Sequence, residues 1–522
     1  MKYIFLLISL FTFNFLQAQV TGVVKDAAGE PIPGANVFWM NTTNGVTTNE
    51  DGNFSIHKPA RSHMLVVSFI GFENDTIHVD KGNQQLDIVL REGVELSEVN
   101  VVTRKLGTMK LRTSVMNEDM ISSAELTRAA CCNLGESFVT NPSVDVSYSD
   151  AATGAKQIKL LGLSGTYVQM MTENIPNFRG AAAPYGLGYV PGPWMQSIQV
   201  SKGSSSVKNG YESITGQINV EFKKPQLPEA DWVSANLFAS STNRYEANAD
   251  ATVKLSKRWS TSLLAHYENE TKSHDSNDDG FVDIPRVEQY NVWNRWAYMG
   301  DHYVFQAGIK ALHETRNSGQ IAHGNTPSHD LYEIGIKTNR YEAFTKNAYI
   351  FDKEKNTNLA LILQGTLHNQ DANYGRKLYD VDQSNFYASL LFETELSKQH
   401  SLSAGLSFNY DGYDQNYRLT NQAEEGLTKK FVKESVPGAY VQYTFNLNDQ
   451  LMLMGGIRGD YSSEYGFFVT PRAHVKYNPN EYLHFRLSAG KGYRTNHVLA
   501  ENNYLLASSR KMKIASHLDQ EE

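Results

Sequence analysis

Hydrophobic and polar residues alternate along most of the chain beyond about residue 231. Over residues 245–255 the odd positions are apolar or aromatic and the even positions are polar. The same alternation returns at residues 402–410 and 439–447. Because successive side chains of a strand point to opposite faces, each segment would have one apolar and one polar face. Such strands of about ten residues are typical of an antiparallel transmembrane β-barrel.

The connections between these segments alternate between short and long. Short ones fall at residues 256–258, 300–301, 352–356, 397–399, 446–449 and 478–481, and longer ones at about 270–287, 314–337, 370–385 and 412–435. The first and sixth connections on the long side are themselves short. This spacing predicts about thirteen strands, with periplasmic turns at one end and outer loops at the other. A soluble sandwich is the alternative, but the strand number and the connection lengths argue against it.

The residues before the barrel follow two other patterns. Short alternating segments with Gly, Asp and Pro turns predict a small β-sandwich over residues 20–91. Further along, residues 198–200 and 218–222 indicate strands, and Ser123 is expected to cap a helix that extends to Phe138. This second zone is therefore expected to be an α+β domain.

Residues 1–18 have the features of a secretory signal peptide. Lys2 precedes an apolar run from Tyr3 to Phe15, and Ala18 is a small residue at the expected cleavage point. The run is too short for a membrane-spanning helix. We therefore expect an exported protein. The formal net charge of -8 argues against nucleic acid as a partner, and two adjacent cysteines exclude a disulfide framework.

Residues 20–91 resemble the carboxypeptidase-regulatory-like domain found ahead of many outer-membrane receptors of Bacteroidetes. The resemblance rests on the Gly and Pro pattern of residues 22–37 and on the turn at residues 48–54. That family name suggests a peptidase, but this zone has no zinc-ligand constellation. The chain also has no evident nucleophile triad, catalytic carboxylate pair or phosphate loop. We expect no enzyme activity.

Residues 195–225 resemble the plug domain of TonB-dependent receptors. The most diagnostic positions are Lys202, Gly203, Gly210, Gly216 and Asn219, with Gly162 and Gly165 in an earlier glycine-rich strand. Two departures concern residues 172–176, where Asp-Gly-x-Pro is usual, and Asn209, where Tyr is usual. Residues 490–494 also resemble a barrel segment of these receptors.

The resemblance implies a Bacteroidetes-type TonB-dependent receptor of mainly β fold. Its parts would be a signal peptide (1–18), the regulatory-like sandwich (20–91), a TonB-box-like segment (92–103), the plug (104–228) and a barrel (229–522). Such barrels have about 22 strands. Because the pattern yields about thirteen strands and the tail is polar and acidic, we expect a C-terminally truncated barrel.

The resemblance also implies that TonB binds an extended segment ahead of the plug. An extended segment can add as a strand to the sheet of its partner. The residues expected to contact TonB are Glu95, Leu96, Ser97, Glu98, Val99, Asn100, Val101 and Val102. An ordinary linker strand is the alternative.

Residues 177–194 are rich in Gly, Pro and aromatic residues without periodicity, which is typical of exposed loops. We expect the ligand to contact Asn177, Phe178, Arg179, Tyr185, Tyr189 and Trp194. Aromatic rings beside an arginine suit a flat anionic ligand or a metal chelate. Packing of these loops against the barrel wall is the alternative.

One outer loop has the spacing of a calcium-binding loop. Asp275, Asn277, Asp279 and Asp283 fall at positions 1, 3, 5 and 9 of an EF-hand-like pattern, although Arg286 stands where a bidentate Glu is expected. A solvated acidic loop is the alternative, and no cofactor is required. Further metal candidates are His313, His323, His329, Cys131 and Cys132, for which scattered surface histidines and small buried cysteines are the commoner interpretations.

These observations favour an importer of a scarce metal chelate, such as a ferric siderophore. It would lie in the outer-membrane lipid of a Gram-negative cell and depend on TonB with its inner-membrane energising complex. The alternatives are an oligosaccharide importer of the same fold and a surface receptor that binds without transport. The plug motif favours transport, since an adhesin needs no plug. A truncated barrel would not transport by itself.

Overall fold

The computed structural model describes residues 19–26, 29–40, 45–49, 51–59, 63–69, 75–79, 85–90, 108–110, 114–225, 232–321, 331–422, 426–447, 450–480, 483–515 and 518–522. The chain forms two compact units, Met1–Lys105 and Leu106–Glu522. The expected signal peptide and the TonB-contact residues 95–102 lie outside the described residues.

The first unit is the expected small β-sandwich. One sheet has the order β4-β1-β7 and the other β3-β2-β5-β6. The strands are β1 (Gln19–Lys25), β2 (Asn36–Trp39), β3 (Gly45–Thr47), β4 (Asn53–His57), β5 (Met64–Ser68), β6 (Asp75–His78) and β7 (Gln85–Val89). Val20, Val37, Trp39, Ile56 and Leu65 are buried in its core. Alternate positions of β1 and β4 supply that core, as the period of a half-buried strand requires.

The second unit begins with a domain built on a six-stranded sheet of order β14-β13-β16-β15-β9-β8, beside a small sheet of order β10-β11-β12. The strands are β8 (Thr108–Lys110), β9 (Asn117–Ser122), β10 (Val144–Asp150), β11 (Ala155–Leu160), β12 (Leu163–Ser164), β13 (Val168–Thr172), β14 (Ile175–Pro176), β15 (Met195–Lys202) and β16 (Gly216–Phe222). β15 and β16 contain the two strands that the sequence predicts, and they pair antiparallel.

The helix predicted from Ser123 to Phe138 is wrong in its start and its length. Helix α2 (Ser123–Arg128) is capped by Ser122, whose Oγ accepts a hydrogen bond from the Glu125 N–H. The chain then turns through Ala130 at a positive φ of 48°. A separate 3-10 helix, η1 (Leu134–Phe138), starts behind its own cap, Asn133. The turn at Ala130 and the cap at Asn133 thus divide one apolar pattern into two short helices.

The remaining helices among the described residues of this unit are short. They are η2 (Gly165–Tyr167), η3 (Gly180–Ala182), η4 (Gly186–Tyr189), η5 (Gly192–Trp194), η6 (Val207–Asn209), α3 (Val498–Glu501) and η8 (Asn503–Ala507). Among the residues that the structure describes, no helix is long and apolar enough to cross a membrane.

The glycines and polar residues of the sequence motif shape the small domain from within. Gly210 has a φ of 105°, which side-chain-bearing residues rarely adopt. A Cβ at Gly165 would lie 2.1 Å from the Ile158 carbonyl oxygen, so the backbones could not approach as they do. Lys202 forms an ion pair with Asp119 at 2.6 Å. Asn219 is buried and accepts a hydrogen bond from the Asn174 N–H at 2.7 Å.

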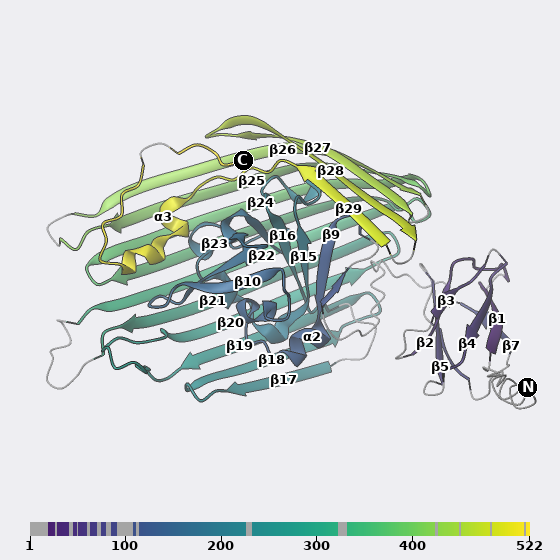
Figure 1. Ribbon diagram of the computed structural model, residues 1–522, viewed down its shortest axis with the longest axis horizontal. Coiled ribbons are helices and arrows are strands. Elements are labelled where there is room, and N and C mark those ends of the chain that lie inside the picture. The colour runs from purple at the N-terminus through teal and green to yellow at the C-terminus, as the bar shows by residue number, and fades with distance from the viewer. Residues whose placement is uncertain are drawn as a thin grey trace, which may run out of the picture. The chain divides into compact units, whose positions relative to one another are not determined.

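The rest of the unit is a thirteen-stranded antiparallel sheet in which each strand pairs with the next along the chain. Its strands are β17 (Trp232–Ala239), β18 (Arg244–Lys254), β19 (Trp259–Glu270), β20 (Arg286–Met299), β21 (Tyr303–Gly319), β22 (Glu333–Asp352), β23 (Thr357–Tyr374), β24 (Lys377–Ser397), β25 (His400–Arg418), β26 (Thr428–Leu447), β27 (Leu451–Ser462), β28 (Gly466–Asn480) and β29 (Leu483–Gly490). The sheet curves around the small domain, which lies on its concave face (Figure 1).

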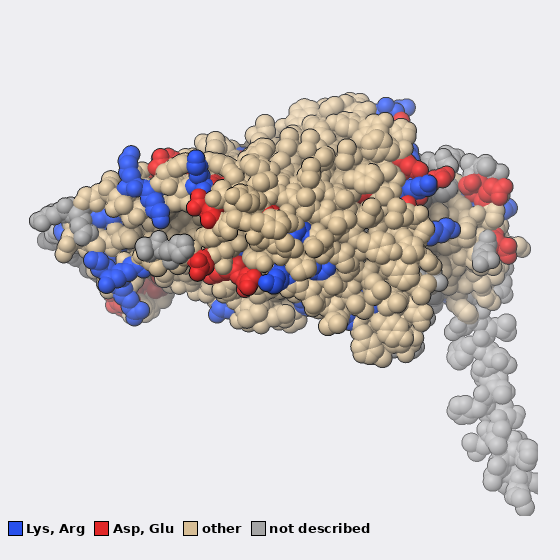
Figure 2. Space-filling view, turned by 90° about the horizontal axis from the view of Figure 1, so that it is seen from above, with Lys and Arg blue, Asp and Glu red and all other residues tan. Residues whose placement is uncertain are grey.

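The polarity of the two faces of this sheet is the reverse of that in a soluble protein, because polar residues are buried and apolar residues are exposed. On β18, Glu246, Asn248 and Asp250 are buried on the inner face, whereas Tyr245 and Val253 are exposed. On β25, Leu406 is 58% exposed. In the view of Figure 2 a largely uncharged belt separates two groups of charged residues. An outward apolar band around a polar interior is the arrangement of a barrel that faces lipid.

The predicted connection at residues 370–385 is wrong. β23 continues to Tyr374 and β24 resumes at Lys377, so the connection is a tight turn at Gly375, whose φ is 59°. The strands here run well beyond the ten residues assumed from the alternation, because β22 to β26 are 18 to 21 residues long. Polar residues such as Asp371 and Asn373 belong to these long strands rather than to a loop.

Candidate ligand site between plug and barrel wall

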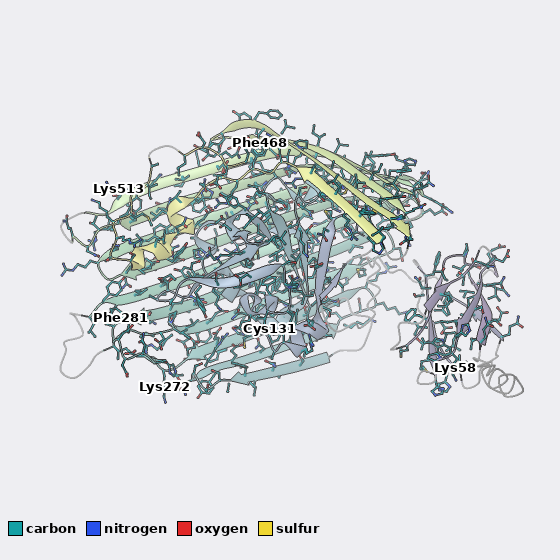
Figure 3. The ribbon with its side chains drawn as sticks, viewed as in Figure 1. Lys58, Cys131, Lys272, Phe281, Phe468 and Lys513 are labelled. Atoms are coloured by element: carbon teal, nitrogen blue, oxygen red, sulfur yellow. The ribbon has the colours of Figure 1, made fainter. Side chains whose placement is uncertain are left out.

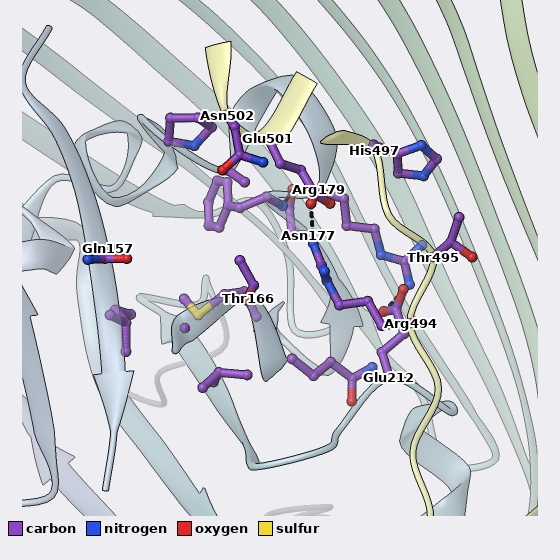
Figure 4. A pocket seen from close by; sticks show the side chains of 18 of the residues that line it. Gln157, Thr166, Asn177, Arg179, Glu212, Arg494, Thr495, His497, Glu501 and Asn502 are labelled. Carbon is purple, nitrogen blue, oxygen red and sulfur yellow. Dashed lines mark hydrogen bonds and ion pairs between the residues drawn. The ribbon is translucent and has the colours of Figure 1, made fainter. Parts of the chain in front are cut away.

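A polar cavity lies between the small domain, the inner face of the sheet and the segment of residues 494–504 that follows β29. Its volume is about 150 Å³. The small domain contributes Phe178, Arg179 and Glu212, the sheet contributes Asp411 and Glu434, and the following segment contributes Arg494, His497 and Glu501. Figure 4 shows Arg179, Glu212, Arg494 and Glu501 gathered around this space from different elements.

Both arginines of the cavity pair with carboxylates. Arg179 pairs with Glu212 at 2.5 Å and with Asp411 at 3.5 Å. Burial lowers the pKa of Arg179, but these two carboxylates outweigh it and raise that pKa, so the guanidinium stays charged. Arg494 pairs with Glu501 and, at 3.0 Å, with Glu521.

Two further groups in the cavity are affected by burial. Burial raises the pKa of Glu501, even though Arg494 opposes the shift. Burial lowers the pKa of His497 to about 4, so its imidazole is neutral near pH 7. The His497 ring lies against the Tyr413 ring, with 4.4 Å between ring centroids. The cavity therefore offers paired charges, a neutral imidazole and aromatic surface rather than a field of one sign.

Five of the six sequence-predicted ligand residues fall into two groups. Asn177, Phe178 and Arg179 line the cavity, and their ligand contact remains a prediction. Tyr189 and Trp194 are fully buried, which contradicts the expected exposed loop. Trp194 packs near Trp293 of β20, with 6.3 Å between ring centroids. The inner face of the sheet has an aromatic surface here. The alternative prediction, that these loops pack against the barrel wall, therefore describes Tyr189 and Trp194.

Tyr185 has a structural contact as well. Its hydroxyl donates to Asn503 Oδ1 at 3.0 Å, and the Tyr374 hydroxyl of β23 donates to the same oxygen at 3.0 Å. Asn503 is fully buried. Tyr185 thus joins the small domain to the segment that closes the cavity.

Buried ion pairs join the small domain to the sheet behind the cavity. Glu173 binds Arg295 of β20 at 2.5 Å and Lys346 of β22 at 3.5 Å. Burial raises the pKa of Glu173, but these two cations outweigh it and lower that pKa to about 2. Asn177 accepts from Arg340 at 2.5 Å and donates to Glu342 at 2.9 Å. The contact is therefore polar and charged as well as aromatic.

The acidic outer loop lies between β19 and β20. Asp275 accepts hydrogen bonds from the backbone N–H groups of Asp279 and Gly280 at 3.1 and 2.9 Å. Asp283 accepts from the Ser276 N–H at 2.8 Å. These carboxylates thus cap their own loop. Within the described part of the chain no group of three or more His, Cys, Asp or Glu residues is placed to hold a metal ion, and calcium binding remains a prediction from the sequence.

Of the other metal candidates, the structure describes His313, Cys131 and Cys132. His313 lies on β21 and its Nδ1 is 2.8 Å from Asn339 Oδ1, while His323 and His329 lie outside the described residues. Cys131, labelled in Figure 3, and Cys132 are buried free cysteines. Burial raises the pKa of both thiols, which disfavours the thiolate that a soft metal needs.

Most cavity residues were missed by the sequence analysis. Glu212, Asp411, Glu434, His497 and Glu501 are polar residues without a local motif, and only the fold brings them together. Arg494 had one signal, because it ends the barrel segment of residues 490–494. In the sequence, that segment supports the family and does not indicate a site.

The fold and the cavity together define an outer-membrane β-barrel receptor with a plug inside its wall. The chain matches the TonB dependent receptor-like β-barrel over residues 199–508, the TonB-dependent receptor plug domain over residues 110–217 and the CarboxypepD_reg-like domain over residues 20–102. It therefore belongs to the TonB-dependent receptors and is an outer-membrane protein of Gram-negative type.

Similar proteins agree with this assignment. The chain is 28% identical over 245 residues to the TonB-dependent receptor SusC of Bacteroides thetaiotaomicron, a match that covers 44% of this chain and 24% of SusC. It is 39% identical over 100 residues to the TonB-dependent receptor P39 of Formosa agariphila, which covers 19% of this chain and 10% of P39. The chain thus spans about a quarter or less of the length of these relatives.

Solved structures share the fold. The alcaligin outer-membrane receptor FauA from Bordetella pertussis matches 77% of this chain and 69% of its own, with a TM-score of 0.60 and 14% identity. The siderophore receptor PirA from Acinetobacter baumannii matches 74% of this chain and 63% of its own, with a TM-score of 0.61 and 14% identity. At this identity the likeness concerns the fold.

Proposed function

We propose that the protein imports a small polar nutrient across the outer membrane in a TonB-dependent way. The observation that supports this most is the polar cavity formed jointly by plug and wall, because a ligand there would contact both parts at once. A ligand can shift a plug only through contacts that differ between its two states. The Arg179 ion pairs, which link the plug residue Glu212 to the wall residue Asp411, offer such contacts.

In the proposed mechanism the ligand enters from the outside and displaces part of this ion-pair network. The plug then changes its conformation. TonB binds the segment of residues 95–102, which adds as a strand to the TonB sheet. Force from TonB, energised by the inner-membrane proton gradient, opens a path along the polar inner wall. The family resemblance supports this sequence of events, and the TonB contact is a proposal for this chain.

For the ligand we propose a metal chelate, such as a ferric siderophore. Arg179 beside Phe178 and Tyr211 suits a flat ligand that carries negative charge. An oligosaccharide is the second candidate. The pairing of Arg179 and Arg494 with carboxylates favours this candidate. The arginines can donate hydrogen bonds to hydroxyl groups and the carboxylates can accept hydrogen bonds from them, so the ligand need not be charged.

The test is uptake by cells that express the full-length protein. Iron-55 complexes of a trihydroxamate and of a tricatecholate chelator, and radiolabelled maltoheptaose, serve as probes. We expect uptake of an iron complex, and deletion of residues 96–102 should abolish that uptake while surface binding is kept. Deletion of residues 27–28 in the first domain is the control.

The outcomes separate the proposals. Uptake of maltoheptaose alone would replace the chelate by the oligosaccharide. Uptake that is unchanged by the deletion of residues 96–102 would contradict TonB dependence through that segment. Surface binding of a probe without uptake by the intact protein would favour a receptor that does not transport.

A further inference from the structure

Arg472 lies on β28, and the thirteen-stranded sheet, here called the wall, fixes the direction of its side chain. It is 3% exposed on the inner face of the sheet. Its cross-strand partner is Gly490, where an added Cβ would lie 2.7 Å from Arg472 Cγ. Its Nε donates to the Lys491 carbonyl oxygen at 3.1 Å. The wall therefore leaves room for the Arg472 side chain, and the two terminal nitrogens of Arg472 point toward the plug.

Both terminal nitrogens bind the backbone of one plug segment, residues 205–213. Nη1 lies 3.3 Å from Ser205 O, 3.2 Å from Ser205 Oγ, 3.2 Å from Ser206 O and 3.1 Å from Gly210 O, and Nη2 lies 3.1 Å from Tyr211 O and 3.3 Å from Ser213 O. A guanidinium has five N–H donors in a fixed fork. Here the fork fits a set of carbonyl groups, so it fixes the path of the backbone.

The same plug segment has further contacts with the wall. Ser206 Oγ donates to Gln442 Oε1 of β26 at 2.6 Å. The Tyr211 ring meets the edge of the Phe468 ring, with 5.2 Å between centroids. Phe468 is labelled on β28 in Figure 3. The segment is therefore fastened to β26 and β28.

The fastened segment also forms part of the cavity. Tyr211 and Glu212 line it, and Glu212 is the partner of Arg179. The carbonyls on either side of Glu212, those of Tyr211 and Ser213, both accept from Arg472 Nη2. The position of the Glu212 carboxylate thus depends on a backbone that Arg472 holds from behind.

We propose that Arg472 is a positioning residue that fixes the plug segment 205–213 to the wall and so places Glu212 opposite Arg179. This segment is the stationary side of the cavity, against which other parts of the plug move. The inference rests on the proposed function only where it takes the cavity to be the ligand site. Lysine cannot replace arginine here, because its single ammonium group cannot reach acceptors spread from Ser205 to Ser213.

The experiment is hydrogen–deuterium exchange of the purified full-length protein in detergent, and it needs no ligand. In Arg472→Lys and Arg472→Gln we expect the backbone amides of residues 205–213 to exchange about tenfold faster or more, the scale of one or two lost hydrogen bonds to a charged group. Exchange in β13 and β16 should not change. Arg295→Lys is the matched control, since this buried wall arginine binds the plug elsewhere, at Lys223 O and Glu173.

A rescue separates positioning from general stability. In the Arg472→Gln background, the pair Ser206→Cys and Gln442→Cys replaces a plug–wall hydrogen bond by two thiols. The glutamine side chain is longer than a cysteine side chain, so a short bis-methanethiosulfonate reagent joins the two thiols. Cross-linking should restore slow exchange in residues 205–213, and reduction should reverse the rescue. Wild-type exchange in Arg472→Lys, or equal acceleration in Arg295→Lys, would overturn the proposal. The exchange experiment does not measure uptake, so its result can be interpreted even if the import proposal fails.

Discussion

At the scale of single residues, the contact between plug and wall depends on buried charges that have opposite partners. Glu173 is 3% exposed and faces both Arg295 and Lys346. Removing one member of a buried pair leaves the other charge uncompensated, which costs far more than an exposed pair is worth. Such residues should therefore dominate the response of the plug to substitution.

We predict that Glu173→Gln destabilises the folded protein by about 3–5 kcal/mol, because Arg295 would stay buried without its charged partner. The pKa of Glu173 is lowered from 4.5 to about 2 in the folded protein. The pair therefore stabilises the wild type above about pH 4.5, and this contribution is lost as the pH falls from there towards 2.

Denaturant unfolding in detergent from about pH 2, the shifted pKa of Glu173, to about pH 7 measures both effects. Glu354→Gln, in the turn between β22 and β23, is the control for loss of a carboxylate. The assignment would be wrong if the two variants had equal stability, or if Glu173→Gln kept the acid dependence of the wild type.

At the scale of elements, the segment formed by α3 and η8 closes the cavity. It is held by Asn503, whose Oδ1 accepts from the hydroxyls of Tyr185 and Tyr374. Asn503 Nδ2 donates to the Ala500 carbonyl oxygen at 2.8 Å. One amide thus connects the closing segment, the plug and β23.

We predict that Asn503→Leu loosens this segment, because it leaves two buried tyrosine hydroxyls without their acceptor. Each unsatisfied group costs about 1–3 kcal/mol. Limited proteolysis after Lys511 and Lys513, measured by mass spectrometry, should become faster. Asn502→Ala is the control in the same segment, since among the described residues the Asn502 side chain bonds within its own turn, to Val498 O. Equal cleavage of the two variants would contradict the role of Asn503.

At the scale of the whole second unit, the outer face of the sheet is the surface expected to meet lipid. Leu406 points outward from the middle of β25 and is 58% exposed. Its cross-strand neighbours, Leu390 and Ala439, are also apolar. A charge at this position would lie beside these apolar side chains.

We predict that Leu406→Arg lowers the amount of protein in the outer membrane, since an arginine on the lipid face costs about 2–4 kcal/mol near the bilayer midplane. Fractionation and heat-modifiable migration on gels measure the folded, inserted protein. Leu406→Ala should remain near the wild-type level. Normal insertion of the arginine variant would mean that this face does not contact lipid.

The strand pattern and the plug motif were predictable because both are local. Alternation at residues 245–255 depends only on the period of a strand, and the structure confirms it on β18. The diagnostic glycines mark backbone conformations, such as the positive φ of Gly210, that few other residues adopt. The long strands β23 and β24 were missed, because polar residues outside the apolar band resemble a loop.

The sequence by itself thus determined the fold class, the thirteen strands and the family, since each rests on short-range periodicity or on a contiguous motif. Only the tertiary structure decided which residues form the cavity. Arg179, Asp411 and Arg494 are far apart in the chain and meet because the plug lies against the inner wall. It also decided that Trp194 is buried, because the burial of a loop depends on the surface that packs against it.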